Sequence, residues 1–226
     1  MRNPTILCCF AVWILAAAPC AAQISAPAQP SREIEVSLEL RRAPGWETID
    51  PQSVLRLGDV IRFRFRSASG GHLYVFSVSS AGEGVWLFPR PAQGQMNSVE
   101  PRTEYVIPGL NGSFVVGGSP GFDIVYWVVS RVSLDTQIKP QRGTQPSTLR
   151  PRCREGPLKA RGLCLDDRAG ASAVQDIGNL PFEWSDADRQ LLSRDLTFRS
   201  EDGLSRVTAH NENDGILVYQ FRIAHQ

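Results

Sequence analysis

Regular alternation of apolar and polar residues marks several segments of the chain as half-buried β-strands. In REIEVSLELR, residues 32–41, the aliphatic side chains share one face and the glutamates share the other. In VIRFRFRS, residues 60–67, the apolar side chains alternate with arginines. A period of two is typical of a strand with one face on a core and one in water. GILVYQFRI, residues 215–223, repeats the pattern and is expected to pair back into the main sheet.

Other segments are apolar on both faces. HLYVFSV, residues 72–78, has this character, which predicts a central strand covered on both sides. The turn residues Gly82-Glu83-Gly84 and the return segment VWLF, residues 85–88, predict a hairpin that Pro89 ends. DIVYWVVSRV, residues 123–132, is rich in β-branched residues and also favours a strand.

Short segments complete the predicted fold. EYVIPG at 104–109, SFVVGG at 113–118 and the segments on either side of Asp202-Gly203 are further strands, while 43–59 has the composition of a loop. WSDADRQLLSRDL, residues 184–196, has the caps of one short helix. We therefore predict a mainly β protein, an immunoglobulin-like antiparallel β-sandwich with one short helix.

Residues 135–179 interrupt this pattern. The segment is rich in proline and glycine and has no periodicity, which indicates a long loop insertion within a single domain of residues 32–226. It contains Cys153 and Cys164, which we expect to form a disulfide that pins the insertion. The rival hypothesis, a metal or redox pair, lacks both a C-x-x-C motif and a second close-spaced pair.

The N-terminal segment predicts export. Arg2 precedes a short apolar run, and small residues follow before Gln23, so residues 1–22 have the features of a signal peptide. Residues 23–31 form a flexible leader. We expect a periplasmic or extracellular protein with no transmembrane segment after cleavage. The alternatives are an uncleaved anchor and a lipoprotein on Cys20, which the preceding Pro19 disfavours.

Charge is balanced over the chain but not locally. Without Arg2, 23 basic and 23 acidic residues remain of the 24 and 23 in the chain, so no net field attracts nucleic acid. Basic residues dominate 139–168, and acidic residues dominate 176–214. The basic segment either binds an anionic partner, such as a lipid headgroup or an acidic polymer, or packs on the acidic tail or is solvated. The candidate binding surface consists of Arg150, Arg152, Arg154, Lys159 and Arg161.

Motifs for catalysis, metals and cofactors are weak, so we assign no catalytic, metal or cofactor residues. GGSPG, residues 117–121, resembles a nucleophile elbow, but a strand follows it and Pro120 has no N–H for an oxyanion hole. The histidines His72, His210 and His225 do not have metal-ligand spacing.

The aromatic residues allow one alternative, a carbohydrate-stacking platform. We favour core packing, because the neighbours Tyr126 and Trp127 point to opposite faces of a strand. The residues concerned are Trp46, Tyr74, Trp86, Tyr105, Tyr126 and Trp127.

An ordered set of motifs resembles the bacterial domain-of-unknown-function family 4384, over roughly residues 32–224. The motifs are LRLGDVIRFRFRS (55–67), GGHLYVFSV (70–78), VWLFP (85–89), EYVIPG (104–109), GSPGFDIVYWVVSR (118–131) and LVYQFRI (217–223). The resemblance implies an exported β-rich module and supplies no catalytic residues. We therefore expect a non-enzymatic interaction module whose partner is an unknown envelope protein or glycan. The alternatives are a carbohydrate- or cell-wall-binding module and a hydrolase whose site is assembled only by the fold.

Overall fold

The structure, a computed structural model, describes residues 32–90, 96–134, 149–160, 162–174, 180, 189–193, 195–210 and 215–226. Residues Ser31–Gln226 form one compact unit. The expected signal peptide and leader lie outside the described residues, as do Arg161 and much of the predicted helix at 184–196. All that follows concerns this unit.

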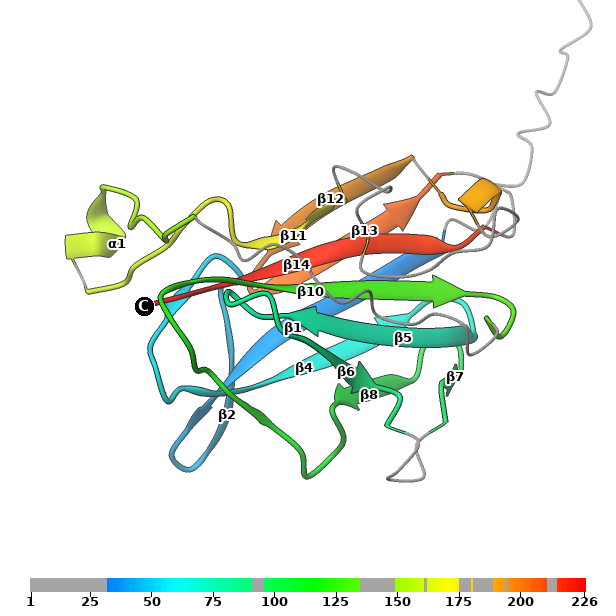
Figure 1. The fold of residues 1–226 in the computed structure, drawn as a ribbon, viewed down its shortest axis with the longest axis horizontal. Coiled ribbons are helices and arrows are strands. Elements are labelled where there is room, and N and C mark those ends of the chain that lie inside the picture. Colours follow the sequence, from blue (N-terminus) through cyan, green and yellow to red (C-terminus); the bar gives the residue numbers. More distant parts are fainter. Residues whose placement is uncertain are drawn as a thin grey trace, which may run out of the picture. The chain divides into compact units, whose positions relative to one another are not determined.

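Two mostly antiparallel sheets form a sandwich, with seven strands each in the described part of the chain (Figure 1). Sheet 1 has the order β12-β13-β1-β4-β8, with β2 beside β1 and β9 beside β4. Its strands are β1 (Arg32–Arg42), β2 (Gly45–Ile49), β4 (Val60–Ser67), β8 (Glu104–Ile107), β9 (Phe114–Val115), β12 (Leu196–Glu201) and β13 (Leu204–Ala209). The predicted mainly β sandwich is therefore confirmed.

Sheet 2 has the order β11-β14-β10-β5-β6, with β3 beside β14 and β7 beside β5. Its strands are β3 (Val54–Leu55), β5 (Gly71–Val78), β6 (Gly84–Phe88), β7 (Ser98–Val99), β10 (Gly121–Ser130), β11 (Gly170–Ala173) and β14 (Leu217–His225). Only the pairing of β3 with β14 is parallel among the described pairs. The last strand thus pairs into a sheet, as predicted.

Sheet 1 has one buried and one polar face, as the alternation predicts. The apolar residues of β1 and β4 enter the core between the sheets. The arginines of β4 lie on the other face and form ion pairs with glutamates, among them Arg62 with the buried Glu39. Arg62 also covers the Trp46 ring at 4.2 Å.

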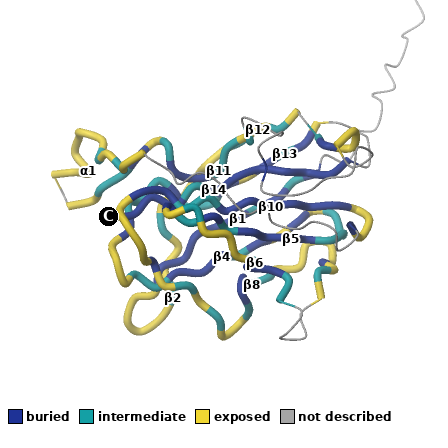
Figure 2. Tube along the Cα trace, in the orientation of Figure 1, coloured by how far each residue is buried: buried dark blue, intermediate teal, exposed yellow. Residues whose placement is uncertain are grey.

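Sheet 2 is covered on both faces, which confirms the prediction for HLYVFSV. Leu73 and Val75 face the core between the sheets, whereas Tyr74 and Phe76 belong to a second cluster on the outer side. The dark blue tube of β5 and β10 in Figure 2 follows this burial. β5 and β6 form the predicted hairpin, and β5 has β10 as its other neighbour.

An aromatic stack crosses the middle of the sandwich. The Trp127 ring of sheet 2 stacks on Phe65 of sheet 1 at 5.7 Å and on Tyr219 at 6.1 Å. Phe63 meets Trp127 edge-on at 5.3 Å. These four side chains are fully buried, so they anchor the two sheets to each other.

Two expectations about irregular segments need correction. The loop expected at 43–59 contains β2 and β3, because β1 and β14 offer free edges that these short strands can pair with. The insertion at 135–179 contains the helix α1 (Pro157–Ala160) and β11, which pairs with β14. Of the helix predicted at 184–196, Arg189 and Gln190 are described and helical, whereas residues 184–188 and 194 lie outside the described residues.

Within the described ranges, no helix is long and apolar enough to cross a membrane.

Candidate functional site

The predicted disulfide closes a loop at one end of the sandwich. We call residues 149–169 the disulfide loop; Cys153 and Cys164 are bonded in it, with Cα atoms 4.8 Å apart, which confirms the prediction. The loop carries α1, none of whose residues is buried. Figures 1 and 2 show α1 projecting from the ends of the strands as an exposed segment.

Backbone hydrogen bonds attach the base of the disulfide loop to the segment before β3. The Val54 N–H donates to the Cys164 carbonyl at 2.8 Å, and the Asp166 N–H donates to the Gln52 carbonyl at 2.9 Å. Ser53 and Leu165 form an antiparallel bridge between these two bonds. Because β3 is itself part of sheet 2, the loop is fixed to the sandwich at its base.

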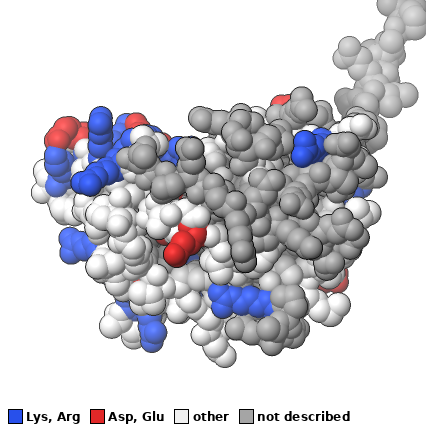
Figure 3. All heavy atoms as spheres, in the orientation of Figure 1, with Lys and Arg blue, Asp and Glu red and all other residues white. Residues whose placement is uncertain are grey.

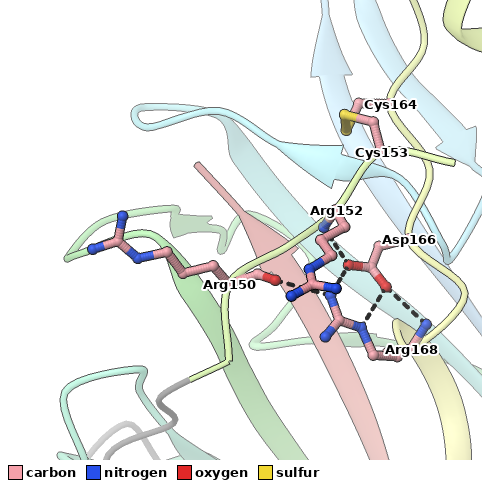
Figure 4. Close-up of polar contacts among 6 residues, drawn as sticks. All are labelled: Arg150, Arg152, Cys153, Cys164, Asp166 and Arg168. Carbon is pink, nitrogen blue, oxygen red and sulfur yellow. Dashed lines mark hydrogen bonds and ion pairs between the residues drawn. A yellow bond between two sulfur atoms is a disulfide. The ribbon is translucent and has the colours of Figure 1, made fainter. Parts of the chain in front are cut away.

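The buried carboxylate of Asp166 holds the loop together by accepting hydrogen bonds from it. Its side chain is 1% exposed and accepts hydrogen bonds from the Arg152 N–H at 2.6 Å and from the Arg168 N–H at 3.0 Å. The Arg168 guanidinium adds two more, from Nε at 2.9 Å and from Nη2 at 2.6 Å. Nη2 also donates to the Arg150 carbonyl at 2.8 Å, so one carboxylate and one guanidinium hold both arms of the loop (Figure 4).

These contacts keep Asp166 ionised. Burial by itself raises the pKa of this carboxyl, but the hydrogen bonds from the Arg168 side chain and from the Arg152 and Arg168 backbone outweigh it and lower the pKa to about 2. The Asp166 carboxylate therefore holds the loop at any pH above this value.

The candidate binding surface is exposed on this scaffold. Arg150, Arg152, Arg154 and Lys159 are all solvent-exposed, and Arg161 lies outside the described residues. Lys159 pairs with Glu155, whereas the guanidinium groups of the three arginines have no ion-pair partner among the described residues. Figure 4 shows the Arg150 guanidinium pointing away from Asp166, and Figure 3 shows basic side chains gathered at the end that carries α1.

A cleft of about 420 Å³ adjoins the loop between β11 and β12, the outermost strands of the two sheet orders. Arginines from three elements line it, Arg168, Arg199 and Arg222, together with Asp167. The Arg168 guanidinium lies 5.2 Å from the centre of the Phe122 ring. Because Arg168 is paired with Asp166, the remaining positive charge of the cleft comes from Arg199 and Arg222.

All three histidines have polar partners outside the disulfide loop, and His72 Nδ1 lies 3.4 Å from Asn97 Oδ1. His210 lines a hollow of about 500 Å³ with Glu33, Glu201 and Asp202, and its Nε2 lies 3.1 Å from the Thr197 hydroxyl. His225 is 1% exposed, and its Nε2 lies 3.3 Å from Asp123. Within the described residues, no three His, Cys, Asp or Glu side chains are grouped to hold a metal ion.

The aromatic residues do not share a surface. Trp127 lies in the core between the sheets, and Tyr126 and Tyr74 lie in the cluster on the outer side of sheet 2. Trp46 is half-buried under an arginine of sheet 1, and Trp86 packs edge-on against Phe76 at 5.2 Å. The expectation of core packing therefore holds for Trp127, Tyr74 and Tyr126, whereas Trp46 belongs to neither core cluster.

The fold and the loop define a two-sheet β-sandwich with a basic, disulfide-closed loop at one end. Residues 54–133 match the family described as Domain of unknown function (DUF4384). The match confirms the resemblance drawn from the motifs, over β3 to β10, a shorter range than 32–224. It ends before the disulfide loop, which lies outside the matched residues. No curated protein and no solved structure matches this chain.

Asp166 is the residue of the candidate site that the sequence pattern missed. It was only one of two adjacent acids, Asp166 and Asp167, in a segment without periodicity. Asp167 is exposed, and only Asp166 turns inward. The one local signal is the spacing of Asp166 and Arg168, which lets the guanidinium reach back to the carboxylate.

Proposed function

We propose that this protein is an exported, non-enzymatic binding module and that its disulfide loop is the surface that takes an anionic partner. The observation that carries this proposal is the set of exposed guanidinium groups of Arg150, Arg152 and Arg154 on a loop that Asp166 and the disulfide hold in place. A positioned arginine loses less conformational freedom on binding than one on a mobile tail.

An internal partner for the loop finds no support in the described part of the acidic tail. In the sequence, the acidic residues of 176–214 could neutralise the loop. Among the residues of that tail that the structure describes, Asp195, Glu201 and Asp202 form no ion pair with an arginine of the loop. Carboxylate, sulfate and phosphate groups all match the guanidinium fork, so the shared chemistry is an anion presented in multiple copies.

A binding titration tests the proposal. The chain from Gln23 onward, the form expected after export, is titrated with fluorescently labelled dextran sulfate, a soluble polyanion. The triple variant R150S/R152S/R154S should bind about tenfold more weakly, because three exposed ion pairs of a few tenths to 1 kcal/mol each are lost. Binding should also weaken as NaCl is raised.

The matched control replaces two exposed arginines on another part of the sandwich, R41S/R42S, and should change affinity little. Equal binding by the wild type and the triple variant would contradict the proposal. A hydrolytic turnover that a single Ser, Asp or His substitution abolishes would contradict the non-enzymatic part of it.

One observation favours a second candidate function, a hydrolase. The Thr197 hydroxyl and the His210 ring are in hydrogen-bonding reach inside the hollow of about 500 Å³ that also contains three carboxylates. A hydroxyl beside an imidazole is the core of nucleophilic catalysis. In the described structure, however, the ring has no carboxylate partner to orient it. Activity on ester substrates that disappears in both H210A and T197V would establish this alternative.

A further inference from the structure

We infer that the anionic partner of the disulfide loop is the surface of a lipid bilayer, with Leu158 and Leu163 entering the headgroup boundary and the basic residues facing the lipid phosphates. The inference rests on the proposed function and names the partner of the same site. The observations behind it are the apolar side chains that stand among the charges of the loop.

Three leucines of the loop are exposed. Leu149 is 47% exposed, Leu158 is 43% exposed and Leu163 is 54% exposed. The Leu163 N–H donates to the Leu158 carbonyl at 2.9 Å, so the backbone holds these two residues next to each other. Two neighbouring exposed leucines on a segment without buried residues form a small apolar surface that the sandwich leaves uncovered.

The basic residues surround this apolar pair in the chain. Arg154 precedes both leucines, and Lys159 lies between them. Arg150 and Arg152 lie nearer the base of the loop. Lys159 is paired with Glu155, so the three arginines supply the unpaired charge. Apolar side chains bordered by Lys and Arg are the composition by which peripheral segments bind an anionic interface.

The exposed leucines distinguish binding to a bilayer from binding to a soluble polyanion. An acidic polymer in water can satisfy guanidinium groups but provides no apolar phase, so exposed leucines add nothing to its binding. A bilayer offers both, because the phosphates lie directly above the acyl boundary. The two partners therefore make opposite predictions for leucine variants.

The position of the loop suits a flat partner. α1, which carries Leu158, is the part of the loop that projects furthest from the strands in Figure 1. The disulfide and Asp166 fix the loop at its base. A flat surface can then meet α1 before it reaches the strands.

Vesicle sedimentation tests the inference with the chain from Gln23 onward. The probes are vesicles of phosphatidylcholine alone and of phosphatidylcholine mixed with phosphatidylglycerol. We expect binding to the mixed vesicles only, since each basic residue near an anionic surface contributes about fivefold. L158S/L163S should weaken the partition into mixed vesicles by about tenfold, because two partly inserted leucines lose apolar contact.

The control is L57S/L110S, which replaces two more exposed leucines in other turns and should leave vesicle binding unchanged. All four leucines are exposed, so each variant should keep the wild-type urea unfolding curve. In a second readout, an L158W variant should lose tryptophan fluorescence to brominated lipid only with mixed vesicles.

The dextran sulfate titration distinguishes the membrane inference from the proposed function. Binding to dextran sulfate that depends on the arginines, without binding to mixed vesicles, overturns the membrane inference and leaves the proposed function standing. Vesicle binding that L158S/L163S leaves unchanged also overturns the inference. Absence of binding to both probes overturns the inference and the proposed function together.

Discussion

Two parallel hydrogen bonds join Arg168 to Asp166, from Nε to Oδ1 at 2.9 Å and from Nη2 to Oδ2 at 2.6 Å. This two-point contact is the strongest geometry available to a guanidinium and a carboxylate. It lies where the two arms of the disulfide loop meet, because the same groups also bind the backbone of Arg150 and Arg152. The shape of the candidate binding surface therefore depends on this pair as well as on the disulfide.

Replacing Asp166 by Asn should loosen the loop. The amide carries no charge and offers one oxygen in place of two, so several donors lose their acceptor. We expect D166N to lower the free energy of unfolding by about 2 kcal/mol, the value of the lowered pKa by linkage, as measured by urea denaturation. D167N, which changes the exposed neighbouring acid, is the matched control and should change stability little. Equal effects of the two variants would contradict this role of Asp166.

The contribution of Asp166 should depend on pH in a defined window. In the unfolded chain the carboxyl titrates near its ordinary pKa of 3.8, and in the fold its pKa is about 2. Between these values the unfolded chain binds more protons, so stability falls as the pH drops. The contribution should be complete above about pH 4 and absent below about pH 2. The difference in urea midpoint between wild type and D166N, followed across this range, should shrink to zero; a constant difference would exclude ionisation as its cause.

Reduction of the disulfide should expose the loop before the sandwich unfolds. The bond between Cys153 and Cys164 closes a short loop and contributes roughly 2–3 kcal/mol on the chain-entropy model. With reductant, trypsin should cut after Arg154 or Lys159 while the strands stay intact, as mass spectrometry of the fragments would show. A C153S/C164S variant should give the same fragments without reductant. Identical patterns with and without reductant would mean that the bond does not constrain the loop.

Gly203 should tolerate no side chain in the turn between β12 and β13. Its φ is +80°, and a Cβ there would lie 2.8 Å from Thr48 Cγ2 and 3.0 Å from the Ile49 carbonyl oxygen. We expect G203A to cost about 1–3 kcal/mol, from left-handed backbone and crowding together. G45A is the control, because a Cβ at Gly45 meets no atom within 4 Å. Thermal unfolding of both variants measures the difference, and similar melting temperatures would contradict the prediction.

The strands that could be predicted from the sequence are those in which apolar and polar residues form a clear local pattern. β1, β4 and β14 alternate clearly, and β5 and β10 are apolar throughout, because one or both faces are buried. β11 could not be found in this way. Its sequence, Gly-Ala-Ser-Ala, has small side chains on both faces, and it is a strand only because β14 pairs with it. When a segment is a strand because a distant strand pairs with it, its own sequence need not show a period of two.

Contacts with residues distant in the sequence also limit prediction of the candidate site. Its charge can be read from the composition of 139–168, and its disulfide from the two remaining cysteines. The burial of Asp166 depends on Gln52 and the segment before β3, more than a hundred residues away in the chain. Exposure of the leucines depends equally on what the sandwich leaves uncovered. Non-local contacts thus decide which residues of the loop are supports and which face outward.

The two-stranded base of the disulfide loop also makes it a natural graft point. The hydrogen bonds that attach the loop join backbone atoms of Gln52, Val54, Cys164 and Asp166. A different sequence between the two cysteines would leave these backbone atoms unchanged. The family match over residues 54–133 ends before the loop begins. A foreign peptide inserted between Cys153 and Cys164 should therefore be displayed on an unchanged sandwich, with its specificity exchanged and its scaffold retained.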